Sequence, residues 1–272
     1  MNSYETENFE KISKEIRKSI IEMVYNAKSG HPGGALSITD ILTVLYFYEL
    51  NVNVNNPKYE NRDRLVLSKG HSSPALYAVL AEKGFFPKND LKTFRKIDSY
   101  LQGHPDMNKV PGVDMSSGSL GQGLSVSNGM ALGAKLDRKD YRVYCILGDG
   151  EIEEGQVWEA AMTASHYNLD NLCVIVDNNG LQIDGKTKDV MNSEPIDKKF
   201  EAFGFNVINI DGHNFEEIVN AFEKAKQTKE RPTAIIAKTV KGKGISFMEN
   251  EVSWHGKAPN DEQYNLAMNE LN

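Results

Sequence analysis

Short apolar runs alternate along the chain with longer stretches in which apolar residues recur at helical spacing. The short runs are rich in β-branched and aromatic residues, as buried strands are. A helix that links two neighbouring strands makes a right-handed crossover, so the strands run parallel. The pattern therefore predicts an α/β fold, with a mostly parallel central sheet and helices on both of its faces. Strands are expected at 64–68, 141–147, 171–177, 206–210 and 233–238, and helices at 5–28, 39–50, 73–83, 120–136, 154–168, 197–203, 215–226 and 260–271.

The size and composition of the chain suit one globular domain. Its 272 residues show no linker or internal repeat, so we expect a single domain over 1–272. The net charge of −7 argues against nucleic acid as a partner. No apolar stretch reaches the roughly 20 residues of a membrane span, and the polar first 20 residues are unlike a secretory signal peptide. Cys145 and Cys173 fall in predicted buried strands, which favours core thiols and a reducing, cytoplasmic location.

Polar motifs follow two neighbouring predicted strands. The first strand ends in Gly148-Asp149-Gly150 and the second in Asn178-Asn179. Because open α/β sheets bind ligands at the carboxyl ends of their strands, we expect these side chains to share a site. One carboxylate and one amide oxygen are hard, oxygen-only ligands. The sequence therefore predicts a magnesium site, with calcium as the alternative.

The turn after the first of these strands is strongly acidic. Asp149, Glu151, Glu153 and Glu154 would repel a bare pyrophosphate unless a divalent cation lay between them. The dinucleotide-binding glycine pattern also fails, because its third glycine would fall on Glu153. A simple helix-capping role is the alternative for Asp149. The paired Asn179 and the acidic turn favour a metal-bridged diphosphate instead.

A second phosphate motif is present but lacks its structural setting. Residues 180–187 match the P-loop pattern and follow a predicted strand. A P-loop must lead directly into a helix, whose N-terminus helps to hold the phosphates. Residues 188–195 show no helical periodicity, so we do not expect an ATP site there.

The paired Gly-Asp-Gly and Asn-Asn motifs resemble those of thiamine diphosphate enzymes, where somewhat under thirty residues separate them. Five further motifs occur in the order and spacing of transketolases, and together they run from residue 29 to residue 256. The chain resembles only the amino-terminal domain of a transketolase. The motifs are SGHPGG at 29–34, LSKGH at 67–71, GHP at 103–105, SLGQG at 119–123 and WHG at 254–256.

The resemblance implies a metal and cofactor site built from matching residues. Asp149, Asn179 and the backbone carbonyl of Leu181 would bind the metal ion. Leu120 and Ile183 would pack against the rings of thiamine diphosphate. The cofactor-binding residues implied in this way are His71, Gly118, Leu120, Gly148, Asp149, Gly150, Asn179, Ile183 and His255.

The resemblance also divides the catalytic roles. His31 and His104 would face the substrate hydroxyls and move protons near neutral pH. His71 and His255 would contact the cofactor diphosphate. Glu154 would lie at the subunit contact, directed toward the partner glutamate that activates the cofactor. The implied catalytic residues are His31, His104, His255 and Glu154.

Three other polar residues receive simpler interpretations. His213 directly precedes a predicted helix and is expected to form a capping turn, while His166 in the crossover helix is expected to be structural. Glu159 matches the family by position only, and its role stays open.

The helix predicted at 120–136 carries small residues four positions apart: Gly121, Ser125, Gly129 and Gly133. An interior glycine costs a helix on the order of 1 kcal/mol relative to alanine. A ridge of small residues offsets that cost where another backbone approaches closely. We expect an inter-subunit or interdomain contact there, beside the cofactor.

Thiamine diphosphate chemistry needs a second protein surface, which presents a glutamate to the aminopyrimidine ring. After Lys241-Gly242-Lys243-Gly244 only 28 residues remain, too few for that domain. The resemblance therefore implies the amino-terminal subunit of a split transketolase, which acts on sugar phosphates. A separate carboxyl-terminal subunit would complete it, with two copies of each chain. The alternatives are a 1-deoxyxylulose-5-phosphate synthase, a non-catalytic cofactor-binding paralogue and the α subunit of a 2-oxo acid dehydrogenase.

Overall fold

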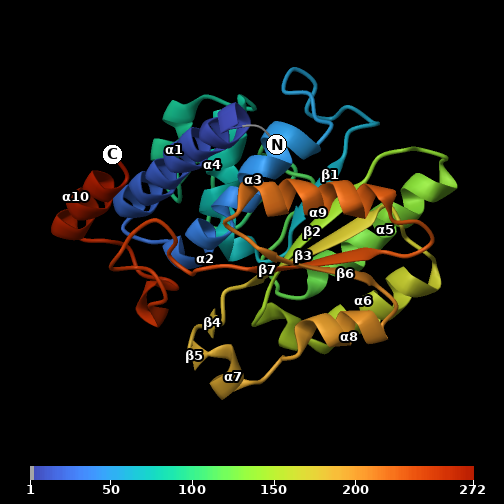
Figure 1. Cartoon of the computed structure of the whole chain (residues 1–272). Helices are drawn as coiled ribbons and strands as arrows, with labels where there is room; N and C mark the ends of the chain where they lie inside the picture. The colour runs from blue at the N-terminus through green and yellow to red at the C-terminus, as the bar shows by residue number, and fades with distance from the viewer. Residues whose placement is uncertain (1–2) are drawn as a thin grey trace.

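A parallel five-stranded sheet forms the centre of the molecule (Figure 1). The computed structural model describes residues 3–272. The order of the strands across the sheet is β1-β2-β3-β7-β6, and every neighbouring pair is parallel. The prediction of an α/β fold is confirmed, and this sheet is wholly parallel. Its strands are β1 Arg64–Leu67, β2 Val143–Gly148, β3 Leu172–Asn178, β6 Asn206–Asp211 and β7 Thr233–Lys238.

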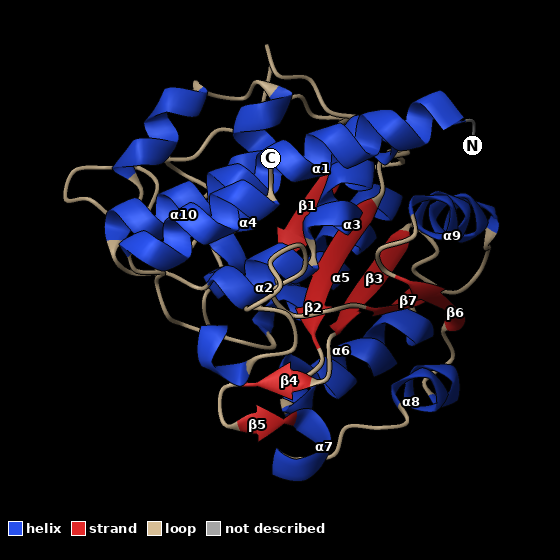
Figure 2. Ribbon diagram, turned by 60° about the vertical axis from the view of Figure 1, so that its left-hand side comes forward, coloured by secondary structure: helices blue, strands red, loops and turns tan. Residues whose placement is uncertain are grey.

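Helices cover both faces of the sheet (Figure 2). Two separate apolar cores are buried between the helices and the sheet. Side chains along a strand point alternately to the two faces, so Tyr144 and Ile146 of β2 enter one core while Cys145 and Leu147 enter the other. Helices α1, α3, α4 and α9 pack on the first face, and α5, α6 and α8 on the second. The helices are α1 Ser3–Ala27, α2 Pro32–Ser37, α3 Thr39–Val44, α4 Ser73–Lys83, α5 Gln122–Leu136, α6 Gly155–His166, α7 Thr187–Val190, α8 Ile196–Ala202, α9 Phe215–Gln227 and α10 Asp261–Glu270.

The two cysteines lie on opposite faces. Cys145 belongs to the core beneath α5 and α6, and Cys173 to the core beneath α1 and α9. Both are free and buried, and burial is the largest cause that raises the pKa of the Cys173 thiol to about 12. They are core thiols, as the sequence predicts.

Some elements differ from the sequence prediction. The helix expected at 39–50 ends at Val44 and continues as a π-helical turn, Leu45–Glu49. Residues 180–187 contain an antiparallel hairpin, β4 Leu181–Gln182 with β5 Gly185–Lys186. The hairpin leads into the single turn of α7, which lies in the segment expected to have no helix. A hairpin does not offer the open backbone curve of a P-loop.

The ridge of small residues is one member shorter than predicted. Gly121 precedes α5 and has φ 81°, a left-handed conformation that favours glycine. Ser125, Gly129 and Gly133 remain on the helix, and a Cβ added at either of these two glycines would meet no atom within 4 Å. In the chain alone this part of α5 therefore faces open space.

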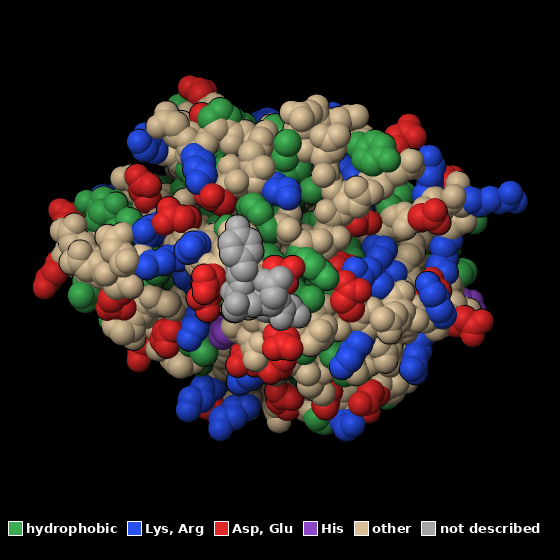
Figure 3. All heavy atoms as spheres, turned by 45° about the horizontal axis from the view of Figure 1, so that its top comes forward, with side chains coloured by type: hydrophobic (Ala, Val, Ile, Leu, Met, Phe, Trp, Pro, Cys, Tyr) green, Lys and Arg blue, Asp and Glu red, His purple; other side chains and the backbone are tan. Residues whose placement is uncertain are grey.

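The surface carries both signs of charge. Figure 3 shows acidic and basic side chains interspersed over one face of the molecule, without a continuous basic region on that face. In residues 3–272, no helix is long and apolar enough to cross a membrane.

Candidate active site

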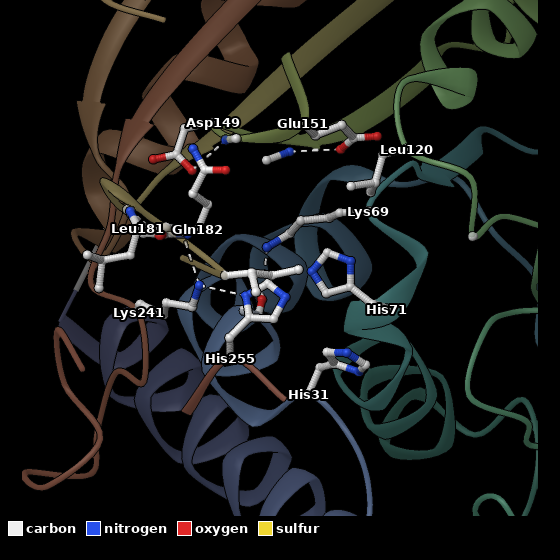
Figure 4. Close-up of a pocket in the computed structure, with 16 residues that line it drawn as sticks. His31, Lys69, His71, Leu120, Asp149, Glu151, Leu181, Gln182, Lys241 and His255 are labelled. Atoms are coloured by element: carbon white, nitrogen blue, oxygen red, sulfur yellow. Dashed lines mark hydrogen bonds between the residues drawn. The ribbon is translucent and has the colours of Figure 1, made fainter. Parts of the chain in front are cut away.

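Four adjacent strands deliver polar side chains to one cavity at the carboxyl edge of the sheet. Lys69 follows β1, Asp149 follows β2, Asn179 follows β3 and Lys241 follows β7. The cavity has a volume of about 230 Å³ and is lined by all four. Parallel strands place their carboxyl ends together, so residues up to 172 positions apart in the sequence meet here. Figure 4 shows Asp149 at one side of this pocket and the site histidines at the other.

Most of the predicted site residues line this cavity, and two do not. His104 is exposed, with its ring against Gly118, where an added Cβ would lie 3.2 Å from the ring. Glu154 is exposed at the N-cap of α6 and forms no capping hydrogen bond. The predicted residues that line the cavity are His31, His71, Gly118, Leu120, Gly148, Asp149, Gly150, Asn179, Leu181, Ile183 and His255.

The structure places the three predicted metal ligands, Asp149, Asn179 and Leu181, in the lining of the cavity. Asp149 accepts hydrogen bonds from the Gly150 and Gly180 amides. Burial first, and the charge of Asp177 second, raise the pKa of Asp149 to about 7. Lys69 already pairs with Asp177, so a divalent cation would supply the nearer charge that keeps Asp149 ionised. The donor set therefore fits magnesium.

The amide of Asn179 has a defined orientation. Its Nδ2 donates to Asp177 Oδ2 at 3.1 Å, while its Oδ1 accepts from the Leu181 amide at 3.1 Å. Within residues 3–272, no group of three or more His, Cys, Asp or Glu side chains has metal-binding geometry. The predicted metal ligands include only one such side chain, Asp149, because the other two are an amide and a backbone carbonyl. The absence of such a group from residues 3–272 therefore does not test these ligands.

Two buried lysines supply the positive charge of the pocket. Lys69 Nζ donates to the Gly34 carbonyl at 2.9 Å and pairs with Asp177. Lys241 Nζ donates to the Leu181 carbonyl at 3.2 Å and contacts His255 Nδ1 at 2.9 Å. Burial first, and Lys69 second, lower the pKa of Lys241 to about 8. Two lysines directed into one cavity suit a diphosphate.

Two buried carboxylates, Asp177 and Glu151, accept hydrogen bonds from the segments that surround the pocket. Asp177 accepts hydrogen bonds from Ser37, Asn179 and Thr239 as well as Lys69. Burial opposes its ionisation, but Lys69 and these bonds keep the pKa of Asp177 below its ordinary value.

Glu151 performs a similar task beside β2. It accepts from the Gly121 and Gly148 amides at 2.9 Å each and from the Ser68 hydroxyl.

Sequence reasoning alone does not place Lys69, Lys241 and Asp177 in the pocket, and it assigns Glu151 only a charge in the acidic turn. Lys69 lies in the LSKGH motif at 67–71 and Lys241 in the KGKG segment at 241–244, and both are buried. An acidic site that binds an anion must bring its own positive charge. That requirement was the signal that could have identified the two lysines.

Three imidazoles cluster at the opposite side of the pocket (Figure 4). The ring centroids of His31, His71 and His255 lie 5.2–5.5 Å apart. Burial is the largest cause that lowers their pKa values, to about 4 for His31, about 2 for His71 and about 3 for His255. All three are neutral at pH 7 and can accept as well as donate hydrogen bonds.

His213 lies in the turn at 211–214 that leads into the cap of α9, as the sequence predicts, and its imidazole also supports the loop that carries Lys241. Asn214 caps α9, accepting from the Glu216 and Glu217 amides. The Val240 amide donates to His213 Nε2 at 2.9 Å, so the proton lies on Nδ1, which bonds Asp40 Oδ2 at 2.7 Å.

Asp40 also supports the other end of the loop at 240–243, which carries Lys241, by binding Arg17. Arg17 forms two hydrogen bonds to Asp40, at 2.9 and 2.7 Å, and its Nε donates to the Lys243 carbonyl at 3.1 Å. Both Arg17 and Asp40 are buried. The loop at 240–243, which carries Lys241, is therefore held on both flanks by one buried network. His166, by contrast, is exposed at the end of α6 and contacts Tyr167.

The sequence matches a known family over almost its whole length. The family described as "Transketolase, thiamine diphosphate binding domain" matches residues 9–271. An apulose-4-phosphate transketolase subunit of Phocaeicola vulgatus is 44% identical over 267 residues, 98% of this chain and 95% of that protein. The 6-deoxy-6-sulfo-D-fructose transketolase subunit SqwG of a Clostridium species is 46% identical, over 94% of this chain and 93% of that protein.

Longer transketolases match over part of their length. Human transketolase is 47% identical over 243 residues, 89% of this chain and 38% of that protein. The crystal structure of transketolase from Campylobacter jejuni has a TM-score of 0.92 and 37% identity, covering all of this chain and 43% of that one. The chain therefore belongs to the transketolase family and corresponds to the thiamine diphosphate-binding, amino-terminal subunit of a split transketolase.

Proposed function

We propose that this chain, with a separate carboxyl-terminal subunit, transfers a two-carbon ketol unit from a ketose phosphate to an aldose phosphate. The observation that carries the proposal is the single cavity that gathers the oxygen donors of Asp149, Asn179 and Leu181, two lysines and three neutral histidines. In this proposal the cofactors are thiamine diphosphate and Mg²⁺, with Ca²⁺ as the alternative ion, and the location is cytoplasmic.

Each group in the cavity has a distinct task in that reaction. When bound, thiamine diphosphate supplies an electron sink for breaking and forming the C–C bond beside the ketose carbonyl. Asp149, Asn179 and the Leu181 carbonyl would hold the metal ion, which would supply positive charge to the diphosphate. Lys69 and Lys241 would balance the remaining charge.

The four site histidines divide between the substrate and the diphosphate. As a neutral group, His31 can take a proton from a sugar hydroxyl and return it, which is the requirement for general acid–base catalysis. His104 is exposed beside Gly118, which lines the cavity, and would contact the hydroxyls of a sugar bound there. His71 and His255 would donate hydrogen bonds to the diphosphate.

The partner would cover the face that α5 and α6 leave open. Ser125 and Gly129 of α5 and Thr163 of α6 line a groove there, and Met162 beside it is 59% exposed. Glu154, exposed at the start of α6, would reach the partner's activating glutamate across this contact. In the proposal the assembly contains two copies of each chain.

Ketol transfer by reconstituted subunits tests the proposal. The chain and its partner are purified separately, and xylulose 5-phosphate and ribose 5-phosphate are supplied with thiamine diphosphate and Mg²⁺. The named relatives use different ketoses, so apulose 4-phosphate and 6-deoxy-6-sulfofructose are included as donors. We expect turnover by the mixture and none by this chain alone. Full activity of the chain alone, or cofactor binding without transfer from any donor, would overturn the proposal; the second result would favour the non-catalytic paralogue.

A further inference from the structure

Arg95 lies between the two loops that carry the substrate-facing histidines. Its Nη1 donates to Ser29 Oγ at 2.9 Å, two residues before His31. Its Nη2 lies against Gly103, where an added Cβ would approach to 2.8 Å, one residue before His104. A side chain at residue 103 would therefore displace the guanidinium.

The backbone around Arg95 is fixed in an uncommon conformation. Arg95 has φ 59°, in the left-handed region that non-glycine residues seldom adopt. Its amide donates to the Leu101 carbonyl at 2.8 Å, which closes the loop that leads to Gly103. Such conformations persist where the surrounding structure fixes them, and they cluster at functional sites.

The His104 loop is held from its other side by α4. Ser73 Oγ donates to the Gly103 carbonyl at 2.8 Å, and the Tyr77 hydroxyl lies 3.1 Å from the His104 carbonyl. The loop at 103–104 is therefore held between Arg95 and two residues of α4, Ser73 and Tyr77. Arg95 also links this loop to the His31 loop, through its hydrogen bond to Ser29.

The guanidinium has no neutralising carboxylate. In residues 3–272, Arg95 takes part in no ion pair within 4 Å, and its Nε is buried without a hydrogen-bond partner. Arginine is rarely buried without a charged partner, and the Arg95 side chain is half-buried. An uncompensated cation next to two catalytic loops indicates a role in the site.

We propose that Arg95 is a positioning residue, which joins the Ser29 and Gly103 loops and thereby fixes His31 and His104 relative to each other for the same sugar substrate. This inference rests on the proposed function, because the substrate contacts of the two histidines belong to it.

The charge of Arg95 has a second effect on the same imidazoles. After burial, Arg95 is the largest cause that lowers the pKa of both His31 and His104. The other groups facing His31 are His71, His104, Lys241 and His255, all cationic or neutral. Removing Arg95 removes a repelling positive charge, so the pKa values of His31 and His104 rise and both imidazoles protonate at higher pH.

The experiment compares Arg95→Met, Arg95→Lys and Ser29→Ala with the wild type, in this chain combined with its partner. Lys96→Met, at an exposed neighbour, is the control. We expect Arg95→Met to lower kcat/KM by about 10- to 100-fold, because small misplacements of catalytic groups have effects of that size. The affinity for thiamine diphosphate with Mg²⁺, measured by calorimetry, should stay within about twofold, since the diphosphate side of the pocket is untouched.

Two readouts separate placement from charge. The acidic limb of kcat/KM should move to higher pH in Arg95→Met and stay in place in Ser29→Ala, which keeps the cation. In Arg95→Lys the acidic limb should lie at the wild-type pH, because the cation is kept, whereas kcat/KM should recover only in part. NMR titration of the His104 imidazole in this chain should show its pKa raised in Arg95→Met alone.

The outcomes decide between the two proposals. An inactive wild-type mixture would refute the proposed function, and the NMR titration would still test the influence of Arg95 on His104. If the wild type is active while folded Arg95→Met keeps its kcat/KM and its pH profile, the positioning role is wrong. If Arg95→Met fails to fold, Arg95→Lys and Ser29→Ala carry the test, and unchanged kinetics in both would overturn the inference.

Discussion

The buried charges of the pocket do not balance in the chain alone. Lys69 and Lys241 face Asp149, Glu151 and Asp177, two cations against three carboxylates. Asp177 is paired with Lys69, and Glu151 accepts three hydrogen bonds, which leaves Asp149 as the carboxylate with the strongest need of a cation. Charge balance therefore makes Asp149 the carboxylate that the proposed metal ion would compensate.

Asp149→Asn should abolish stabilisation by thiamine diphosphate and Mg²⁺ and leave the fold intact, because the amide keeps the shape but loses the charge. In the wild-type complex, ligand at a hundredfold excess over its Kd should stabilise by about 2.7 kcal/mol. Thermal denaturation with and without both ligands measures the difference. The exposed Asp189→Asn is the control. A wild-type ligand-induced rise in Tm for Asp149→Asn would contradict the metal assignment.

His104→Ala should retain cofactor affinity and lose turnover, because His104 is exposed at the rim and does not line the cofactor cavity. Loss of one proton-transferring group lowers rate by about 10²- to 10⁴-fold. Steady-state kinetics and calorimetry on the same preparation separate the two effects. Failure to bind the cofactor would show that the histidines are divided differently.

The sequence predicts the residues of this site better than their electrostatics. Asp149, Asn179 and the three clustered histidines follow from strand ends and family motifs. The functions of Lys69 and Asp177 do not, because a lysine counts as a site cation only once both its burial and its partner are known. The exposure of His104 and Glu154 likewise depends on tertiary packing and on a second chain.

Among the elements, the loop at 240–243 depends on residues remote in sequence. His213 and Arg17 each bond one flank of it, and Asp40 joins them. Lys241 lies between these two anchors. Its placement in the pocket is therefore a property of α1, α3 and the segment before α9 together.

His213→Leu should weaken binding of thiamine diphosphate with Mg²⁺ by about tenfold, since it leaves the Val240 amide and Asp40 each short of a partner, at roughly 1–3 kcal/mol apiece. His213→Gln can donate to Asp40 and accept from Val240, so it should recover most of the affinity. Calorimetry measures the affinity, and hydrogen exchange of the 240–243 amides reports the loop itself. Wild-type affinity in a folded His213→Leu chain would show that this network supports only the fold.

Element prediction succeeds where one periodicity dominates and fails where tertiary contacts choose the conformation. The five strands and the helices at 5–28 and 215–226 carry clear apolar patterns and agree with the structure to within two residues. Helix α2 was not predicted, because its glycines disfavour helix and its burial comes from packing. The β4–β5 hairpin is too short to carry a period.

At the scale of the whole molecule, the groove between α5 and α6 combines small residues with exposed apolar ones. Ser125 and Gly129 line it, and Met162 and Val126 beside it are 59% and 37% exposed. Interior glycines weaken a helix, and a Cβ added at Gly129 or Gly133 would meet no atom within 4 Å, so the chain alone gives no packing reason for them. Their presence is explained if a partner backbone packs against them, as in the proposed assembly.

Gly129→Leu should therefore have opposite effects on the chain and on the assembly. In the isolated chain it should raise stability by up to about 1 kcal/mol, because leucine favours helix over glycine and its Cβ meets no atom within 4 Å. In the mixture with the partner it should weaken association by about tenfold or more, near 1.4 kcal/mol, because the side chain holds the facing backbones apart. Thermal denaturation of the chain and light scattering of the mixture measure the two effects. Ala202→Leu, an exposed site on α8 outside the groove, should leave association unchanged. Unchanged association for Gly129→Leu would place the partner on another face and leave the glycines of α5 without a reason in the assembly.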